Sequence, residues 1–246
     1  MDRMLYIAAD GASQIQKAQA VNANNLANVS TTGFKAHFEA LRALPVYGPG
    51  YASRVHSQTE ISGVDQSPGA LMATGRSLDI AVNGTGWIAI QAPDGSEAYT
   101  RAGDLRVSAT GILETGAGHP VLGDGGPISV PDAQELEIGS DGTVTVLPTG
   151  QAPSTLAVVG RIKLVNIAPG DLEKGDDGLL RPRNGGTAEA DANVRIASGV
   201  LESSNVNTVE AMTTMIQLAR QFEAQVKLMK VAEEADAASA KLMSVS

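Results

Sequence analysis

The residues in this chain that most resemble a chemical motif are 84–89, which read Gly-Thr-Gly-Trp-Ile-Ala directly after an apolar run. This is the spacing of a dinucleotide-binding loop, which must open a helix whose N-terminus holds the pyrophosphate. Here the turn Pro93-Asp94-Gly95 follows after a few residues, and Trp87–Ile90 reads as a strand. Because the sequence leaves no room for the helix, we expect no nucleotide site.

The other candidate catalytic and metal-binding residues lack the necessary spacing. The histidines His37, His56 and His119 form neither an HxxxH nor an HExxH pattern. The run 176–178, Asp-Asp-Gly, lacks the alternating oxygen ligands and closing glutamate of a calcium loop. There is no cysteine and no GxSxG serine. We therefore expect a protein that is not an enzyme, with no catalytic, cofactor or metal site, no cofactor and no small-molecule substrate.

The formal net charge of −9 argues against nucleic-acid binding, which needs a basic surface. The charge is unevenly placed, since residues 1–35 and 207–246 together carry as many basic as acidic groups. The whole excess of negative charge lies in residues 36–206. Unless this distribution is due to chance, it indicates ends that bind other protein and a middle that stays in solvent.

The beginning of the chain does not resemble a secretory signal. Residues 1–7 are too short and polar for its apolar region, and no apolar run approaches the roughly 18 residues of a membrane span. We expect no transmembrane segment, and a protein that either stays in the cytosol or is exported without a cleaved signal.

Residues 2–29 are predicted to form a helix with a seven-residue repeat. The positions with alternating spacing of three and four are Leu5, Ala8, Ala12, Ile15, Gln19, Asn22, Leu26 and Val29. The run 30–33, Ser-Thr-Thr-Gly, ends the helix, with Gly33 available for a left-handed turn. Such a thin and partly polar stripe favours packing against partner helices over independent stability.

Residues 207–241 are predicted to form a second helix, begun by Asn207 with Glu210 three residues later. Its repeat is wholly apolar and is widened by neighbouring apolar residues. The repeat positions are Met212, Met215, Ala219, Phe222, Val226 and Met229, and the flanking positions are Ile216, Leu218, Leu228 and Val231.

Between the helices the pattern changes to short strands separated by turns, which predicts an antiparallel β domain over residues 76–202. Leu78–Val82 and Trp87–Ile90 flank Asn83-Gly84-Thr85-Gly86 and are predicted to pair as a hairpin. Further strands are predicted at Ala98–Arg101, Leu105–Ser108, Ile112–Glu114, Leu136–Ile138, Thr143–Leu147, Leu156–Val159 and Arg161–Ile167.

The predicted fold class is therefore α+β, with N- and C-terminal helices that pair as a coiled-coil-like stalk and a central antiparallel β-rich domain. The predicted division is a helical arm at 1–35, an extended linker at 36–75, the β domain at 76–202 and a second helical arm at 203–246.

Four asparagines between positions 22 and 28 are unusual, because asparagine lowers helix stability by several tenths of a kcal/mol per residue. One interpretation is a helix end that breaks up into a loop. The other is that the amides form hydrogen bonds across a packed interface and determine its register.

Residues 24–35, Asn-Asn-Leu-Ala-Asn-Val-Ser-Thr-Thr-Gly-Phe-Lys, resemble the N-terminal signature shared by flagellar rod and hook proteins. Residues 204–207, Ser-Asn-Val-Asn, followed by Met212, Met215-Ile216, Arg220 and Phe222-Glu223, resemble the C-terminal signature of that family. Residues 75–84 and 99–103 are similar to its β domain, so the resemblance covers most of the chain in the right order.

The resemblance implies a structural subunit of the flagellar basal-body rod, with terminal helices in an inner layer and the β domain outside. It implies export through the flagellar type III apparatus without signal cleavage, and neighbouring rod subunits as partners. Residues 37–46 are most similar to the linker of the proximal rod subunit, and the distal rod or hook subunit is the alternative. We expect self-assembly through the terminal helices into the torque-transmitting shaft.

Subunit packing is predicted for eight residues of the two terminal helices, as contacts that bury apolar surface or determine register. They are Leu5, Ile15, Asn25, Leu26, Asn28, Met215, Phe222 and Val226.

Functions from other classes have less support in the sequence. A secreted β-rich carbohydrate-binding module needs an exposed aromatic platform, and the chain has only one Trp, three Phe and four Tyr. An enzyme acting on cell-wall glycan needs paired carboxylates, and no such motif is present.

Overall fold

The computed structural model of the chain describes residues 2–45, 55–148, 156–175 and 177–244. The chain forms two compact units. The helical unit contains residues 1–27, 37–62 and 207–246, and the β unit contains residues 28–36 and 63–206. The four-part division expected from the sequence stays a prediction.

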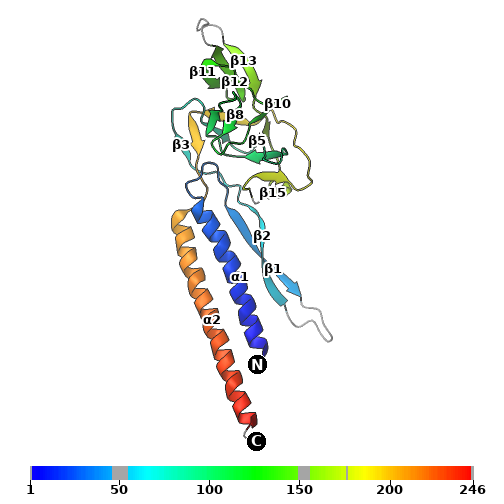
Figure 1. Ribbon diagram of the computed structural model, residues 1–246, viewed down its shortest axis with the longest axis vertical. Helices are drawn as coiled ribbons and strands as arrows, with labels where there is room; N and C mark the ends of the chain where they lie inside the picture. The colour runs from blue at the N-terminus through cyan, green and yellow to red at the C-terminus, as the bar shows by residue number, and fades with distance from the viewer. Residues whose placement is uncertain (1, 46–54, 149–155, 176, 245–246) are drawn as a thin grey trace. The chain divides into compact units, whose positions relative to one another are not determined.

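The helical unit is built on α1 (Asp2–Ala27) and α2 (Thr208–Ser244), which pack against each other along their lengths in opposite directions (Figure 1). The α+β class and the pairing of the terminal helices are thus confirmed, and both helices lie within three residues of their predicted ends. A coiled-coil geometry stays a prediction.

α2 begins where the sequence predicted it. The side-chain Oδ1 of Asn207 accepts hydrogen bonds from the backbone N–H groups of Val209 (3.0 Å) and Glu210 (3.3 Å). These are donors that the first turn of a helix leaves without a helical partner, so Asn207 acts as the N-cap.

The helical unit also contains a pair of strands in the range for which the sequence indicated an extended segment. β1 (His37–Pro45) and β2 (Val55–Val64) pair with each other, and β1 contacts α1. The side-chain amide of Asn25 binds the first residue of β1. Its Oδ1 accepts a hydrogen bond from the N–H of His37 (2.9 Å), and its Nδ2 donates one to the carbonyl of His37 (3.2 Å).

The β unit consists of short strands, and its one helical segment among the described residues is the 3-10 turn η1 (Pro169–Asp171). Its first strands are β3 (Leu71–Ala73), β4 (Ile80–Asn83), β5 (Trp87–Gln91), β6 (Glu97–Thr100), β7 (Leu105–Val107), β8 (Leu113–Thr115), β9 (Leu122–Gly123) and β10 (Gly126–Pro127). The remaining ones are β11 (Ala133–Ile138), β12 (Thr143–Pro148), β13 (Ala157–Arg161), β14 (Leu164–Val165), β15 (Leu172–Lys174), β16 (Leu180–Pro182), β17 (Arg195–Ser198) and β18 (Val200–Glu202).

The strands pair in antiparallel fashion into one five-stranded sheet, one three-stranded sheet and several two-stranded ribbons. The five-stranded sheet has the order β14-β5-β6-β16-β15, and the three-stranded sheet has the order β11-β12-β13. Two clusters of buried side chains form the core. The larger includes Ile80, Ile88 and Leu113, and the smaller is centred on Trp87 and Tyr99.

The hairpin predicted around Asn83-Gly84-Thr85-Gly86 is wrong. Both of its strands exist, but β4 pairs with β17 and β5 pairs with β6 and β14. The backbone of Gly86 has φ of 134°, and a Cβ there would lie 2.6 Å from the side chain of Val194. Residues 83–86 therefore form a glycine-dependent crossover from the β4–β17 ribbon to the five-stranded sheet. The hairpin does not form because β4 and β5 pair with other strands of the chain instead of with each other.

Candidate subunit-packing site

The predicted seven-residue repeat of α1 lies on the face that packs against α2. Ala8 and Ala12 are buried, Ile15 and Leu26 are half-buried, and Leu5 is exposed. Small residues let the two helices approach closely. The repeat of α1 is therefore a contact surface although several of its side chains are small.

The α2 residues predicted for subunit packing differ in burial. Met215 and Phe222 are half-buried, on the same side as the buried Ala211. Val226 is exposed. The structure thus brings Ile15, Leu26, Met215 and Phe222 into the helical unit and leaves Leu5 and Val226 at its surface.

Polar contacts determine the register of the helix pair. The side-chain Nδ2 of Asn22 donates to the carbonyl of Ala211 at 2.8 Å. Farther along the helix pair, Gly11 of α1 lies close to the Gln225 side chain of α2, since a Cβ added to Gly11 would be 3.3 Å from it. Asn22 thus forms the kind of interface hydrogen bond that the sequence suggested for these asparagines.

The two predicted asparagines have local partners in the structure. Asn25 binds the backbone of His37, as described above, and Asn28 accepts from the hydroxyl of Thr31 at 3.2 Å. Their roles in packing between subunits stay predictions.

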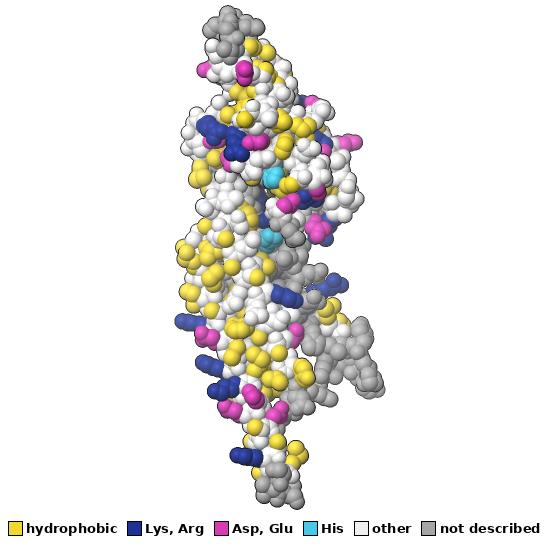
Figure 2. Space-filling view, viewed as in Figure 1, with side chains coloured by type: hydrophobic (Ala, Val, Ile, Leu, Met, Phe, Trp, Pro, Cys, Tyr) yellow, Lys and Arg dark blue, Asp and Glu magenta, His cyan; other side chains and the backbone are white. Residues whose placement is uncertain are grey.

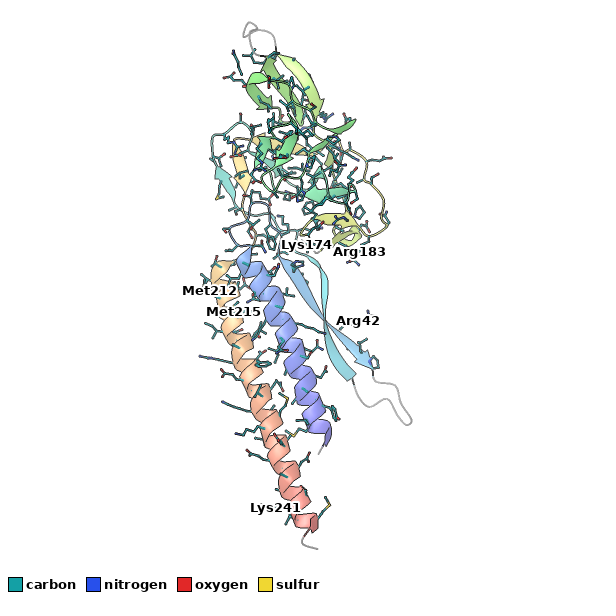
Figure 3. All side chains as sticks on the ribbon, viewed as in Figure 1. Arg42, Lys174, Arg183, Met212, Met215 and Lys241 are labelled. Carbon is teal, nitrogen blue, oxygen red and sulfur yellow. The ribbon has the colours of Figure 1, made fainter. Side chains whose placement is uncertain are left out.

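Sequence reasoning missed an exposed apolar surface on the first turns of α2. Val209 is 71% exposed, Met212 is 51% exposed and Ile216 is 56% exposed. The spacing of three and four puts them on one side of the helix, away from Phe222 and Ala211. We call Val209, Met212 and Ile216 the α2 outer face. Hydrophobic side chains are visible along the helices in Figure 2, and Figure 3 labels Met212.

The signal for this surface was present in the sequence as an apolar stripe too wide for one partner helix. The repeat pattern alone did not show which half of the stripe contacts α1.

The β unit contains a buried cluster of charges formed by Lys35, Arg101 and Glu202. Lys35 is 3% exposed, Arg101 is 5% exposed and Glu202 is 1% exposed. Lys35 Nζ lies 2.6 Å from Glu202 Oε1, and Arg101 Nη1 lies 3.0 Å from Glu202 Oε2. One carboxylate therefore pairs with two buried cations, with each oxygen facing one of them.

Backbone groups complete the hydrogen bonding of the cluster. The N–H of Gly69 donates to Glu202 Oε1 (2.9 Å), and Lys35 Nζ donates to the carbonyl of Ser67 (2.7 Å). Arg101 also donates to the carbonyls of Val82 (3.3 Å) and Gly84 (2.6 Å), at the start of the crossover. Its guanidinium lies 5.1 Å from the centre of the Trp87 ring. These contacts meet most of the polar requirements of charges that would otherwise be costly to bury.

The surroundings shift the pKa of both partners of the Lys35–Glu202 pair. Burial alone would raise the pKa of the Glu202 carboxyl, but the hydrogen bonds from Lys35 and Gly69 and the charge of Arg101 hold it below its ordinary value. Burial lowers the pKa of the Lys35 ammonium, against the opposing effect of Glu202. The cluster thus favours a charged Glu202.

The cluster joins the segments that lead out of α1 and into α2. The N–H of Gly33 donates to the carbonyl of Glu202 (2.8 Å), and the N–H of Ala36 donates to Asn205 Oδ1 (2.8 Å). Gly33 has φ of 66°, as expected, and its Cα lies so close to Arg101 that a Cβ would overlap the backbone there. The three signatures noted in the sequence therefore meet at one buried cluster.

This arrangement binds distant segments of the chain together. Within the described part of the chain, no set of three or more His, Cys, Asp or Glu side chains could hold a metal ion. Neither described helix has a stretch long and apolar enough to span a membrane.

Three family models match the chain in the order of its sequence. The model "Flagella basal body rod protein" matches residues 5–35, "Flagellar hook protein FlgE/F/G D1 domain" matches residues 81–146, and "Flagellar basal body rod FlgEFG protein C-terminal" matches residues 197–242. The matches include Lys35, Arg101 and Glu202.

Curated relatives are similar over the whole chain. The flagellar basal-body rod protein FlgF of Salmonella typhimurium is 46% identical over 252 residues, and that of Escherichia coli is 44% identical, with 100% of both chains covered in each case. The basal-body rod protein FlgG of Bacillus subtilis is 36% identical, with 95% of this chain and 96% of the relative covered. A secreted carbohydrate-binding module is therefore not favoured.

The relatives are rod proteins and not enzymes, which agrees with a site built from packing surfaces and a buried ion cluster. The chain belongs to the family of flagellar basal-body rod proteins, most resembles FlgF, and is a structural subunit of the basal-body rod.

Proposed function

We propose that the chain is a subunit of the proximal rod and assembles with neighbouring rod subunits through its terminal helices. The observation that supports this best is the α2 outer face, an apolar surface on a helix whose opposite side already packs against α1. A helix apolar on two sides is normally buried on both, so a second partner is expected here.

The partner we propose is a helix of another rod subunit, and the packing is coiled-coil-like. Leu5 and Val226 belong to the same predicted contacts, since both are exposed although they follow the seven-residue repeat. Asn25, Leu26, Asn28, Ile15, Met215 and Phe222 hold the helices in the conformation that neighbours recognise. Contacts between two different faces of successive subunits produce an open helical filament, as a torque-transmitting shaft requires.

The proximal position is supported by the two FlgF relatives that are 46% and 44% identical over the full length of both chains, whereas the other FlgF relatives (30–34%) and the FlgG relatives (30–36%) do not separate the two positions. Electron microscopy of isolated basal bodies with a label on this protein tests it. Label at the distal end of the rod, or in the hook, would contradict the proposal.

We propose further that the type III apparatus exports the chain without cleavage and that the rod crosses the periplasm. Removing the 15–30 residues of an ordinary signal would delete most of α1, against which α2 packs. Intact mass of the protein from basal bodies tests this. A mass lacking more than Met1 at the N-terminus would contradict it.

The assembly surface is tested by replacing Met212 and Ile216 together with alanine. Both are exposed, so the free energy of unfolding of the purified chain should change by no more than about 0.5 kcal/mol. Cells carrying the variant should lose most motility and most complete rods in a basal-body count.

The matched control replaces the exposed Lys227 and Lys230 of the same helix with alanine. It removes a similar amount of side chain without removing apolar surface, and motility should remain. Normal rods in cells with the Met212/Ile216 variant would refute the α2 outer face as an assembly surface.

A further inference from the structure

Lys174, the last residue of β15, is a half-buried cation of the β unit (Figure 3). Its Nζ donates to the carbonyl of Lys35 at 2.8 Å and lies 3.7 Å from the centre of the Phe34 ring. Among the residues that the structure describes, no carboxylate forms an ion pair with Lys174. Lys174 is half-buried, so its ammonium group loses part of its hydration, and a carbonyl with an aromatic face replaces only some of what is lost.

Two described carboxylates of this part of the β unit, Glu202 and Asp177, have other partners. Glu202 is shared between Lys35 and Arg101. Asp177 receives two hydrogen bonds from Arg181, at 3.0 and 2.6 Å. Among the described residues, Lys35, Arg101 and Lys174 carry three positive charges, against the carboxylates of Glu202 and of Asp65, which also acts on Lys35. The described residues of this part of the β unit thus carry a surplus of positive charge.

Lys174 lines a cavity of about 190 Å³ that also has Phe34, Trp87, Arg101 and His119 in its wall. The buried Nε of Arg101 has no hydrogen-bond partner within the described residues. A cavity of this size is below the usual range of about 300–1,000 Å³ for small-molecule sites. It suits a single side chain with a small charged end and an apolar stem.

We propose that this cavity, the Lys174 cavity, binds a carboxylate, supplied in the rod by an acidic side chain of a second copy of this chain. The choice of a second copy as the source of the carboxylate rests on the proposed function. The binding of a carboxylate in the cavity does not. The carboxylate would complete the charge of Lys174, and its methylene stem would contact the aromatic wall.

Charge complementarity favours a second copy as the source. The excess of nine negative charges lies in residues 36–206. Exposed carboxylates occur on this part of the chain, for example Glu135 and Glu137 on the edge strand β11. A positive cavity that receives an acidic edge of the next copy is a contact between two different faces, which extends into a filament.

Nuclear magnetic resonance of the full chain, labelled with carbon-13 at the lysine Cε atoms, tests carboxylate binding directly. The probe is sodium propionate, with sodium chloride at equal ionic strength as the reference. We expect a saturable shift of the Lys174 signal with propionate only, and none for Lys163, which is already paired with Glu97 at 2.8 Å. A Lys174 response equal to that of Lys163, or equal in chloride, would overturn the site.

The same signals report the charge state of Lys174. Burial lowers its pKa to about 8 in the cavity. The groups around the cavity are Lys35, Arg101 and His119, with Asp177 already bound to Arg181. A bound carboxylate stabilises the ammonium, so propionate should raise the pKa of Lys174. An unchanged pKa in saturating propionate would count against binding.

The variant Lys174→Met keeps the length of the side chain without its charge, and Lys230→Met on the exposed surface of α2 is its control. We expect propionate to produce no saturable shift of any signal in Lys174→Met and to leave the Lys230→Met response normal. If Lys174→Met does not fold, the titration of the unaltered chain still decides the question.

Carbodiimide crosslinking of isolated basal bodies identifies the source, because it joins an amine to a carboxylate in direct contact. We expect covalent dimers of this chain, with Lys174 in the crosslinked peptide, and no such dimer with Lys174→Met. Crosslinks from Lys174 to another rod protein, or no crosslink, would overturn the second copy as the source. Absence of the protein from basal bodies would contradict the proposed function instead and leave the propionate result standing.

Discussion

At the scale of single residues, Glu202 is the centre of the buried cluster, because its carboxylate contacts Lys35, Arg101 and the N–H of Gly69. All three contacts come from different parts of the chain. The side chain therefore acts as a crosslink between segments distant in sequence.

We predict that Glu202→Gln lowers the free energy of unfolding of the β unit by about 3–5 kcal/mol, since it leaves two buried cations without a carboxylate. Urea unfolding monitored by the fluorescence of Trp87 measures this. The exposed Glu173, two positions into β15, supplies the control Glu173→Gln, which should change the value by less than about 0.5 kcal/mol. Equal stabilities of the two variants would show that the cluster contributes little.

The same residue predicts how stability depends on pH. The folded-state pKa of Glu202 lies below its ordinary value of 4.5, so its contribution is complete above pH 4.5 and is lost as pH falls through the folded value. Unfolding measured between pH 6 and pH 3 should show a larger loss for the unaltered chain than for Glu202→Gln. Parallel curves for both proteins would assign the acid sensitivity to other carboxyls.

At the scale of elements, the helix pair combines small buried residues with a few polar contacts. Ala8, Ala12, Ala211 and Ala232 are buried, whereas the larger apolar residues of α2 are half-buried or exposed. Alanine contributes little apolar area, so the pair has modest stability and a well-defined register.

We predict that Met215→Ala with Phe222→Ala weakens the pairing of α1 and α2 by about 2 kcal/mol per residue, near the lower end for truncations because both side chains are half-buried. Hydrogen exchange of residues 5–26 should become faster while exchange in β5 and β6 stays the same. Rods should fail to form. Faster exchange in the β strands would show that these side chains support the β unit directly.

The amide of Asn22 provides a test of register. In Asn22→Asp, the donor that binds the carbonyl of Ala211 is replaced by an acceptor, and we predict a loss of about 1–3 kcal/mol in the stability of the helix pair. Gln16→Glu, an exposed amide-to-carboxylate change on the same helix, should have a much smaller effect. Circular dichroism at increasing urea compares the two variants. Equal midpoints would show that the hydrogen bond does not stabilise the pair.

At the scale of the whole molecule, the chain passes between its two compact units at four places, after residues 27, 36, 62 and 206. The β unit therefore includes the short segment 28–36, which comes directly after α1. This segment supplies Lys35 to the buried cluster, so the β unit depends on residues that the sequence assigned in part to the helical arm.

We predict that a fragment of residues 28–206 unfolds at a higher temperature than one of residues 36–206. The shorter fragment lacks Lys35 and the hydrogen bond from Gly33 to Glu202, which leaves Glu202 with a single buried cation. Breaking one buried pair costs about 3–5 kcal/mol, which is expected to lower the midpoint by about 6 °C or more for a unit of this size. Equal midpoints in calorimetry would show that segment 28–35 is not part of the folded β unit.

The sequence alone was sufficient for the helices, the fold class and the family. Repeats of three and four residues depend on local geometry, and so do the Asn207 cap and the left-handed turn at Gly33. Most of the strands predicted between residues 98 and 167 exist, because an apolar run between turn residues is a local signal as well.

Strand pairing, by contrast, was decided only by the tertiary structure. Local turn residues suggested that β4 and β5 pair, but β17, more than a hundred residues later, pairs with β4. Short strands such as β15 and β16 contain polar residues and have no clear alternation, so their pairing depends on partners that the local sequence does not show.

The buried cluster and the Lys174 cavity also required the tertiary structure. Lys35, Arg101 and Glu202 are separated by 66 and 101 positions, and in sequence each looks like an ordinary surface charge. Their burial and pairing, and the position of Lys174 apart from every described carboxylate, arise because folding removes water from side chains that come from distant segments. The local sequence determined the helices and many strands, whereas long-range packing determined which charges became buried and which apolar face of α2 stayed exposed.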